Sequence, residues 1–190
     1  MSISEANAIN SEAGASPDMS HHDSYSDEHF RAIFARVRSV AVVGASADPT
    51  KASYFVVKYL LSKGFRVIPV NPKLAGQTLL DQPVYASLSD LPEPPDMVDI
   101  FRNSHAAGGI TDEAIAVGAK LVWMQLGVRN DGAARRAEAA GLTVIMNRCP
   151  KIEYARLAGE IGWNGVNSRV ISSKKPVMRQ GFQSFGIRQK

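Results

Sequence analysis

Hydrophobic and polar positions follow two repeating patterns along residues 30–157. Short runs of consecutive apolar residues predict buried strands, and apolar residues spaced three or four apart predict amphipathic helices. The expected strands cover residues 39–43, 65–70, 97–101, 120–124 and 143–146, with a short edge strand at 83–85. The expected helices cover residues 30–37, 53–63, 109–117 and 130–140, and a last helix starts at Pro150.

This alternation of apolar strands and amphipathic helices is typical of a parallel sheet that is covered on both faces. Gly64, Gly118 and Gly141 each directly follow an expected helix, where glycine commonly ends helical structure. We therefore predict an α/β fold, Rossmann-like and doubly wound, with a mostly parallel sheet of about five strands.

The two ends of the chain differ from this body in composition and charge. Residues 1–29 contain six acidic residues and no Lys or Arg, and they show no hydrophobic period. We expect residues 1–28 to form a disordered acidic tail. Residues 168–190 carry six basic and no acidic residues, so they are expected to be a flexible basic tail. The predicted domain spans residues 29–167.

Composition argues against several classes of protein. No apolar run reaches the roughly 18 residues that span a bilayer, and the N-terminus lacks the charged and apolar regions of a secretory signal. The single cysteine cannot form an intramolecular disulfide, so we expect a cytoplasmic protein without membrane association. The net charge of +4 suits a polyphosphate ligand. Nucleic-acid binding is not expected, because the body lacks interleaved aromatic and basic residues.

A group of histidines near the N-terminus could be interpreted as metal ligands. His21, His22, Asp23 and His29 lie close together in the sequence. Nothing around them in the sequence would hold a coordination geometry, so we interpret them as a solvated tail and predict no metal site.

Candidate binding residues follow the expected strands, because the ligand of an open parallel sheet lies beyond the carboxyl ends of its strands. The first connection begins with Gly44, Ala45 and Ser46 and continues to Lys51, where a helix N-terminus would favour a phosphate. The other segments are Asn71-Pro72-Lys73, Phe101-Arg102-Asn103 and Gln125-Leu126-Gly127, of which Gln125 is the candidate binding residue.

The first two connections depart from the dinucleotide-binding pattern. Only Gly44 of a G-x-G-x-x-G motif is present, and no acidic residue follows about 20 residues later to bind a ribose hydroxyl. Lys73 stands there instead. The sequence thus argues against NAD, tolerates NADP and suits an adenosine that carries a 3′-phosphate.

Several segments carry a resemblance to a known family. VAVVGASADPTKAS, VIPVNPK, VDIFRNS, AIAVGAKLVWMQLGV and MNRCPKIEYARL resemble, in this order, the CoA-binding domain family. Its stand-alone members are similar to the N-terminal domain of the succinyl-CoA synthetase α subunit. The resemblance covers about residues 30–170 and implies coenzyme A, or an acyl-CoA, as the ligand.

The resemblance also implies roles for individual residues. Gly44, Ala45 and Ser46 would surround the CoA phosphates, Lys73 would contact the nucleotide, and residues 101–103 would pack against the pantetheine or adenine. Simpler interpretations stay open: Phe101 as a core aromatic, Lys73 as a solvated turn lysine, and Arg102 as an ion-pair partner of Asp99 or Asp48.

The leading prediction is non-catalytic binding of CoA or an acyl-CoA, for sensing, storage or delivery. Succinyl-CoA synthetase needs a phosphorylated histidine in a second domain, whereas His105 is expected to be an ordinary surface histidine. One alternative is an NADP-dependent oxidoreductase, with Tyr54 and Lys58 as its acid and base. Another is the CoA-binding subunit of an acyl-CoA synthetase with a separate partner. A protein partner or a homo-oligomer also stays open.

Cys149 is the one candidate for covalent chemistry. It precedes Pro150 at the expected start of the last helix, between Arg148 and Lys151. Helix N-termini and nearby cations lower the pKa of a thiol, and CoA itself ends in a thiol. A plain structural cysteine is the favoured interpretation, and a redox thiol that forms a mixed disulfide with CoA is the hypothesis that we keep beside it.

Overall fold

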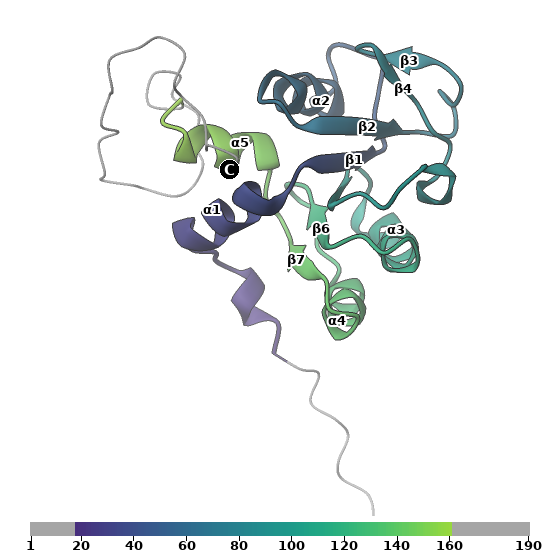
Figure 1. Cartoon of the computed structure of the whole chain (residues 1–190). Coiled ribbons are helices and arrows are strands. Elements are labelled where there is room, and N and C mark those ends of the chain that lie inside the picture. The colour runs from purple at the N-terminus through teal and green to yellow at the C-terminus, as the bar shows by residue number, and fades with distance from the viewer. Residues whose placement is uncertain (1–17, 161–190) are drawn as a thin grey trace, which may run out of the picture.

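The computed structural model describes residues 18–160, which build one five-stranded parallel sheet. The strands are β1 (Ser39–Val43), β2 (Arg66–Val70), β5 (Met97–Ile100), β6 (Leu121–Met124) and β7 (Thr143–Ile145). Their spatial order is β2-β1-β5-β6-β7, and every neighbouring pair is parallel (Figure 1). This confirms the predicted Rossmann-like α/β fold.

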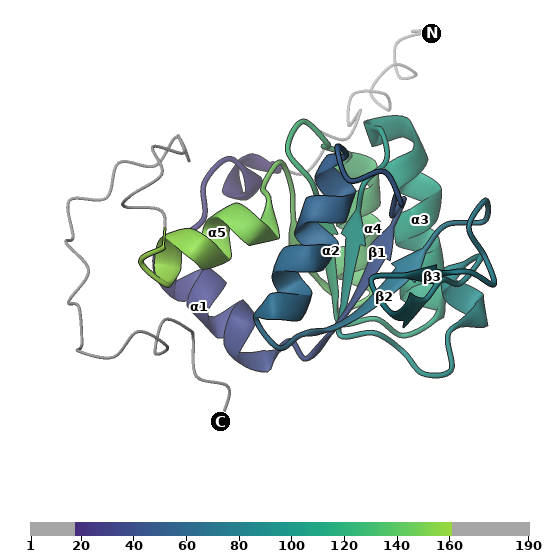
Figure 2. The ribbon, with the colours of Figure 1, turned by 90° about the horizontal axis from the view of Figure 1, so that it is seen from above.

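The helices cover both faces of the sheet. They are α1 (Asp27–Arg36), α2 (Ala52–Ser62), α3 (Ser104–Ala116), α4 (Asp131–Ala139) and α5 (Pro150–Leu157), with short 3₁₀ turns η1 (Ser20–His22) and η2 (Leu88–Asp90). Figure 2 shows α1, α2 and α5 on one face and α3 and α4 on the other. Within residues 18–160 the helices are too short or too polar to cross a bilayer.

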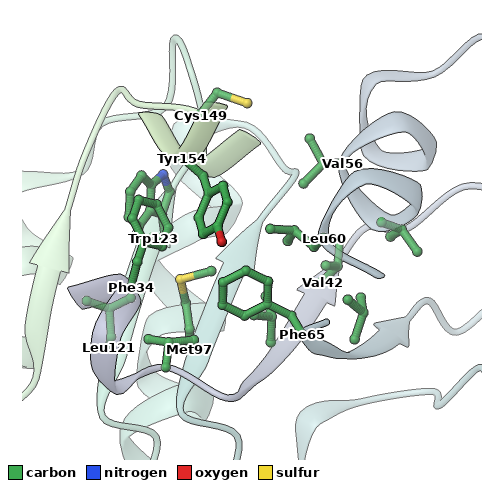
Figure 3. Close-up of a cluster of buried hydrophobic side chains, with 14 of the residues drawn as sticks. Phe34, Val42, Val56, Leu60, Phe65, Met97, Leu121, Trp123, Cys149 and Tyr154 are labelled. Atoms are coloured by element: carbon green, nitrogen blue, oxygen red, sulfur yellow. The ribbon is translucent and has the colours of Figure 1, made fainter. Parts of the chain in front are cut away.

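Successive residues of each strand point to opposite faces of the sheet and pack into two separate hydrophobic cores. Val42, Met97 and Trp123 point toward α1, α2 and α5, whereas Val98 and Val122 point toward α3 and α4. Figure 3 shows the first cluster, in which Tyr154 of α5 packs edge-on against Phe34 and Phe65. Burying one large apolar side chain completely contributes roughly 1.5–3 kcal/mol to the free energy of folding. Because both faces of these strands are buried, nearly every strand residue is apolar, and the strands appear in the sequence as continuous apolar runs.

Two expected elements differ in extent. The predicted edge strand at 83–85 is replaced by a small hairpin of β3 (Thr78–Leu79) and β4 (Gln82–Pro83), while Tyr85 makes a single parallel bridge with Val70. Helix α3 begins at Ser104 and not at residue 109, because the Asn103 side chain caps it by accepting a hydrogen bond from the Ala106 N–H. His105, expected to be an ordinary surface histidine, is exposed and lies in the first turn of α3.

Residues 18–28, which the sequence pattern assigned to a disordered tail, are ordered and packed. Met19 and His22 are buried. The Tyr25 hydroxyl accepts a hydrogen bond from the Met146 N–H at 2.8 Å. The start of the domain therefore lies at least eleven residues before the predicted boundary at residue 29. The rest of the predicted acidic tail (1–17), the last residues of the predicted domain (161–167) and the predicted basic tail (168–190) lie outside the described residues.

A truncation that starts the chain at Asp27 should lower the free energy of unfolding by about 2–4 kcal/mol, because it removes the buried parts of Met19, His22 and Tyr25. Urea unfolding followed by far-UV circular dichroism measures this change. A truncation that starts at Asp18 is the matched control, since it keeps every contact of residues 18–26. Equal stability of the two proteins would contradict the packing described here for this segment.

Candidate functional site

The connections that follow β1 and β5 meet at the carboxyl edge of the sheet. The chain leaves β1 toward β2 on one side, and β5 lies on the other side, so the topological switch point falls between β1 and β5. Gly44, directly after β1, adopts a φ of +90°. A Cβ at this position would lie 2.6 Å from the Phe101 carbonyl oxygen and 3.1 Å from Arg102 Cδ. Glycine is therefore required for the two connections to pack, and Arg102 lies across the first of them.

The connection after β2 supports the one after β1. Asn71 Nδ2 donates a hydrogen bond to the Ala45 carbonyl at 2.7 Å, and Asn71 Oδ1 accepts one from the Lys73 N–H at 2.9 Å. Ala45 is buried, whereas Pro72 and Lys73 are exposed. Asn71 thus has a structural role at this edge, and the Lys73 side chain extends into solvent beside it.

The first connection ends at the N-terminus of α2. Its turn is held by Asp48, whose carboxylate accepts hydrogen bonds from the N–H and the hydroxyl of Thr50, and by Ser46 Oγ, which accepts one from the Asp48 N–H. Lys51 is the N-cap residue of α2, and its side chain caps no helix N–H. The first N–H groups of α2 are therefore available to an anion.

A cavity of about 720 Å³ opens beside this helix end. Five of the predicted residues line it: Phe101, Arg102, Asn103, Gln125 and Cys149. Seven others, Gly44, Ala45, Ser46, Lys51, Asn71, Pro72 and Lys73, do not line the cavity; they form the connections just described. Ala52 connects the two regions, because it lines the cavity and directly follows Lys51.

The pattern of strand ends missed the residues that α2, α5 and the segment after Gln125 bring to the cavity. These are Phe55, Val56, Val128, Lys151 and Ile152; Leu126, which belongs to a strand end named from the sequence, also lines the cavity. Phe55 and Leu126 are the large apolar side chains of the described chain that stay exposed, at 48% and 57%. A signal was present in the sequence for Leu126, which follows the end of a strand, but none marked Phe55 as different from its buried neighbours.

The cavity and its mouth carry positive charge. Within residues 18–160, no carboxylate forms an ion pair with Lys51, Lys73 or Arg102. The ion pair considered for Arg102 with Asp99 or Asp48 is thus not formed. Lys151 Nζ lies 5.9 Å from the ring centre of Phe55, so this aromatic ring borders the lysine inside the cavity. Such cations suit an anionic ligand.

Asp99 is a buried acid beneath the cavity that the sequence pattern did not single out as a site residue. It lies in the middle of β5 and is fully buried, and Gln125 Nε2 donates hydrogen bonds to its two oxygens at 2.9 and 3.1 Å. Burial raises the pKa of Asp99 to about 8, although the hydrogen bonds from Gln125 oppose the shift. At neutral pH the carboxyl group is mostly protonated.

The chain matches the family model described as "CoA binding domain" over residues 38–155. The chain belongs to this family. This CoA-binding domain is 33% identical to the uncharacterized protein YneT of Bacillus subtilis over 130 residues, which cover 68% of this chain and 95% of YneT. A solved structure of a hypothetical protein from Pyrococcus horikoshii is similar with a TM-score of 0.68 and 39% identity, covering 72% of this chain and 95% of that one.

The CoA-binding domain also resembles part of a larger enzyme. It is 33% identical over 90 residues to the alpha subunit of an ADP-forming acetate–CoA ligase I of Pyrococcus furiosus. The match covers 45% of this chain but only 19% of the ligase subunit. The similarity therefore concerns one part of the ligase subunit.

Cys149 of the CoA-binding domain lies at the N-cap of α5 as predicted, but its thiol is not activated. The side chain is only 8% exposed, at the edge of the aromatic cluster and near Val56 of α2 (Figure 3). Burial raises the pKa of the thiol to about 11, with a smaller contribution from the charge of Asp99, although the backbone N–H of Ile152 opposes the shift. The predicted lowering of this pKa is wrong, because desolvation exceeds the effects of the helix N-terminus and Lys151.

Cys149 should therefore react slowly with CoA disulfide at pH 7, roughly tenfold to a hundredfold more slowly than an exposed cysteine. The rate should rise about tenfold per pH unit up to pH 9, because only the thiolate attacks. Intact-mass measurements over time record the gain of one CoA, with Cys149→Ser as the control. Fast modification at pH 7 with no dependence on pH would show that the thiol is ionised after all.

Proposed function

We propose that the CoA-binding domain binds coenzyme A or an acyl-CoA and has no catalytic activity of its own. The observation that supports this most strongly is the cavity of about 720 Å³ that begins at the free N-terminus of α2, at the switch point of the sheet. An anion site and an apolar cavity side by side match a ligand that has a phosphorylated nucleotide at one end and a long pantetheine arm at the other.

The nucleotide end of CoA binds at the connections after β1 and β2. The N–H groups at the start of α2 and those of Ala45 and Ser46 donate hydrogen bonds to the pyrophosphate. Gly44, whose own N–H donates to the Val70 carbonyl, lets the connection curve around it. Arg102, which lies across Gly44, adds charge to the same place. Lys73, exposed after β2, binds the 3′-phosphate of the ribose.

The pantetheine arm occupies the cavity. Phe55, Phe101, Leu126 and Ile152 offer it apolar surface, and Asn103 provides an amide group for its peptide-like bonds. The arm ends near Cys149 and Gln125, and Gln125 donates a hydrogen bond to the buried Asp99, whose pKa is raised to about 8 by burial. A protonated Asp99 leaves this end without a negative charge, which suits either a thiol or an uncharged thioester.

The oxidoreductase alternative has less support. Tyr54 and Lys58, its acid and base, are not among the residues that line the cavity. Tyr54 packs against the aromatic cluster, and Lys58 is exposed on α2. A subunit of an acyl-CoA synthetase would use the same CoA site, so the binding experiments apply to that alternative as well.

Melting temperatures with CoA and with dephospho-CoA test the proposal. A ligand that binds only the native state stabilises it by mass action, so both should raise the melting temperature, and CoA should raise it more. In Lys73→Ala, CoA should raise the melting temperature only as much as dephospho-CoA does. Removing the lysine and removing the 3′-phosphate abolish the same contact. Lys58→Ala, an exposed lysine on α2 outside the cavity, is the matched control. If CoA and dephospho-CoA raise the melting temperature of the wild-type protein equally, Lys73 does not bind the 3′-phosphate. If neither raises it, the protein does not bind CoA.

A further inference from the structure

The segment before α1 and the end of α4 bring together three side chains that commonly bind metals. His21 and His22 lie in η1, and Glu138 lies in the last turn of α4, more than a hundred residues later. Figure 1 shows η1 passing beside β7 and α4. Glu138 Oε1 is 3.0 Å from His21 Nε2 and 3.1 Å from His22 Nε2, and the three atoms all lie within 4.8 Å of one another.

The environment of His22 shows an unused ligand atom. The side chain is only 2% exposed. Its Nε2 atom is buried and has no hydrogen bond of acceptable geometry within residues 18–160, although the Glu138 oxygen is close by. A buried polar atom without a partner costs roughly 1–3 kcal/mol, so its position beside a carboxylate and a second imidazole needs an explanation.

The other ring nitrogen of His22 has an oxygen partner, as the second nitrogen of metal-binding histidines usually does. His22 Nδ1 is 2.8 Å from the Tyr25 hydroxyl oxygen, which also accepts the Met146 N–H at 2.8 Å. A phenol oxygen has two lone pairs, so it can accept hydrogen bonds from both donors. A proton on Nδ1 leaves the Nε2 lone pair free and directed at Glu138. A histidine that donates its second N–H to an oxygen is the usual arrangement around a bound metal.

We propose that His21, His22 and Glu138 bind a divalent transition-metal ion, with Zn²⁺ as the best fit. Two imidazoles and one carboxylate form a ligand set that Zn²⁺ accepts, with a fourth position left for water. Ligand atoms around one tetrahedral zinc lie about 3.3 Å apart, given bonds of about 2.0–2.1 Å. Glu138 Oε1 is 3.0 Å from His21 Nε2 and 3.1 Å from His22 Nε2, so these atoms would have to move apart by only a few tenths of an ångström. The side chains of the exposed His21 and the half-buried Glu138 can make this movement.

The surroundings are compatible with a bound cation. The three ligands line a cavity of about 320 Å³, together with His29, which leaves room for water at the open position. Arg129 is a positive charge near His22, and both Asp23 and Asp131 form ion pairs with it; Arg148 lies over the Tyr25 ring and donates to the Asp23 carbonyl. A metal ion here would connect η1 to α4 and so fasten the N-terminal segment to the domain.

Calorimetric titration of the full chain with Zn²⁺, after treatment with EDTA and desalting, tests the site. We expect one ion per chain. Glu138→Gln and His21→Ala should each weaken binding by more than tenfold, since even changes in the surrounding hydrogen bonds cost ten- to a hundredfold. Both positions are at the surface, so the variants should fold like the wild type. His105→Ala, an exposed histidine on α3, and Cys149→Ser are the controls and should bind as before.

Co²⁺ provides a second measurement that does not depend on stability. Bound at the proposed site, it should give the visible absorption of a low-coordinate complex, and this absorption should disappear in Glu138→Gln. Absence of Zn²⁺ binding, unchanged binding in both ligand variants, or loss of binding only in Cys149→Ser would each overturn the proposal. The last result would place the ion at the thiol and not at η1.

Discussion

Gly44→Ala is expected to lower the free energy of unfolding by about 2–4 kcal/mol and to abolish CoA binding. Part of the cost is the backbone conformation, because a φ of +90° is unfavourable for a residue with a Cβ. The rest is steric, since the new Cβ would lie 2.6 Å from the Phe101 carbonyl oxygen. That oxygen belongs to the backbone of the neighbouring connection, so the contact can be relieved only by moving the two connections apart.

Two other glycines separate these contributions. Gly118 has a φ of +77°, and a Cβ added there would meet no atom within 4 Å, so Gly118→Ala measures the backbone cost alone. Gly109 lies within α3 with open space around it, and Gly109→Ala should be neutral or stabilising by up to about 1 kcal/mol. Urea unfolding gives the three stabilities, and titration with CoA gives the affinities. A Gly44→Ala protein as stable as Gly118→Ala, with CoA binding intact, would contradict the close packing at the switch point.

Asp99→Asn should remove a strong pH dependence of stability. The pKa of Asp99 is raised by burial to about 8 in the folded protein, against an ordinary value of 3.8. Between these two values the folded state holds a proton that the unfolded state has released. The stabilisation that this proton gives to the folded state is therefore fully present below pH 3.8. It decreases as the pH rises and is lost above pH 8. The expected slope is about −1.4 kcal/mol per pH unit.

Asparagine keeps the shape and the hydrogen-bonding capacity of the protonated acid, and Gln125 can still donate to it. The variant should therefore resemble the wild type near pH 3.5, where the acid is protonated in both the folded and the unfolded state, and be more stable by several kcal/mol at pH 9. Urea unfolding at a series of pH values measures the difference. Asp81→Asn, at an exposed aspartate, is the control and should leave the pH profile unchanged. A wild-type profile parallel to that of Asp99→Asn would mean that Asp99 is ionised in the fold.

The fold was predictable because its strands are buried on both faces. Ala41 and Val42 point into opposite cores, so the strand reads as an unbroken apolar run. The start of α3 was not predictable from the apolar pattern. Gly108 and Gly109 interrupt the apolar period of the helix, and its N-cap residue, Asn103, is polar. Residues 18–26 were missed because Met19, His22 and Tyr25 pack individually, without the period of a helix or a strand.

Some residues of the candidate site could also be predicted from the sequence, and others could not. Phe101, Arg102 and Gln125 could be named from the sequence, because strand order alone brings the carboxyl ends of parallel strands together. Phe55 and Lys151 could not, because their position depends on how α2 and α5 pack against the sheet. The pKa of Cys149 was predicted in the wrong direction for a related reason: sequence shows the neighbouring charges of a thiol but not its burial.

Calorimetric titration of the purified full chain, first with CoA and then separately with NADP, tests the central claim most directly. Both ligands carry a phosphorylated adenosine and a pyrophosphate, but only CoA has a pantetheine arm to fill the cavity beside Phe55 and Leu126. We expect one CoA bound per chain, with an affinity clearly higher than that for NADP. Binding of NADP with an affinity equal to or higher than that of CoA, or no binding of CoA at all, would contradict it.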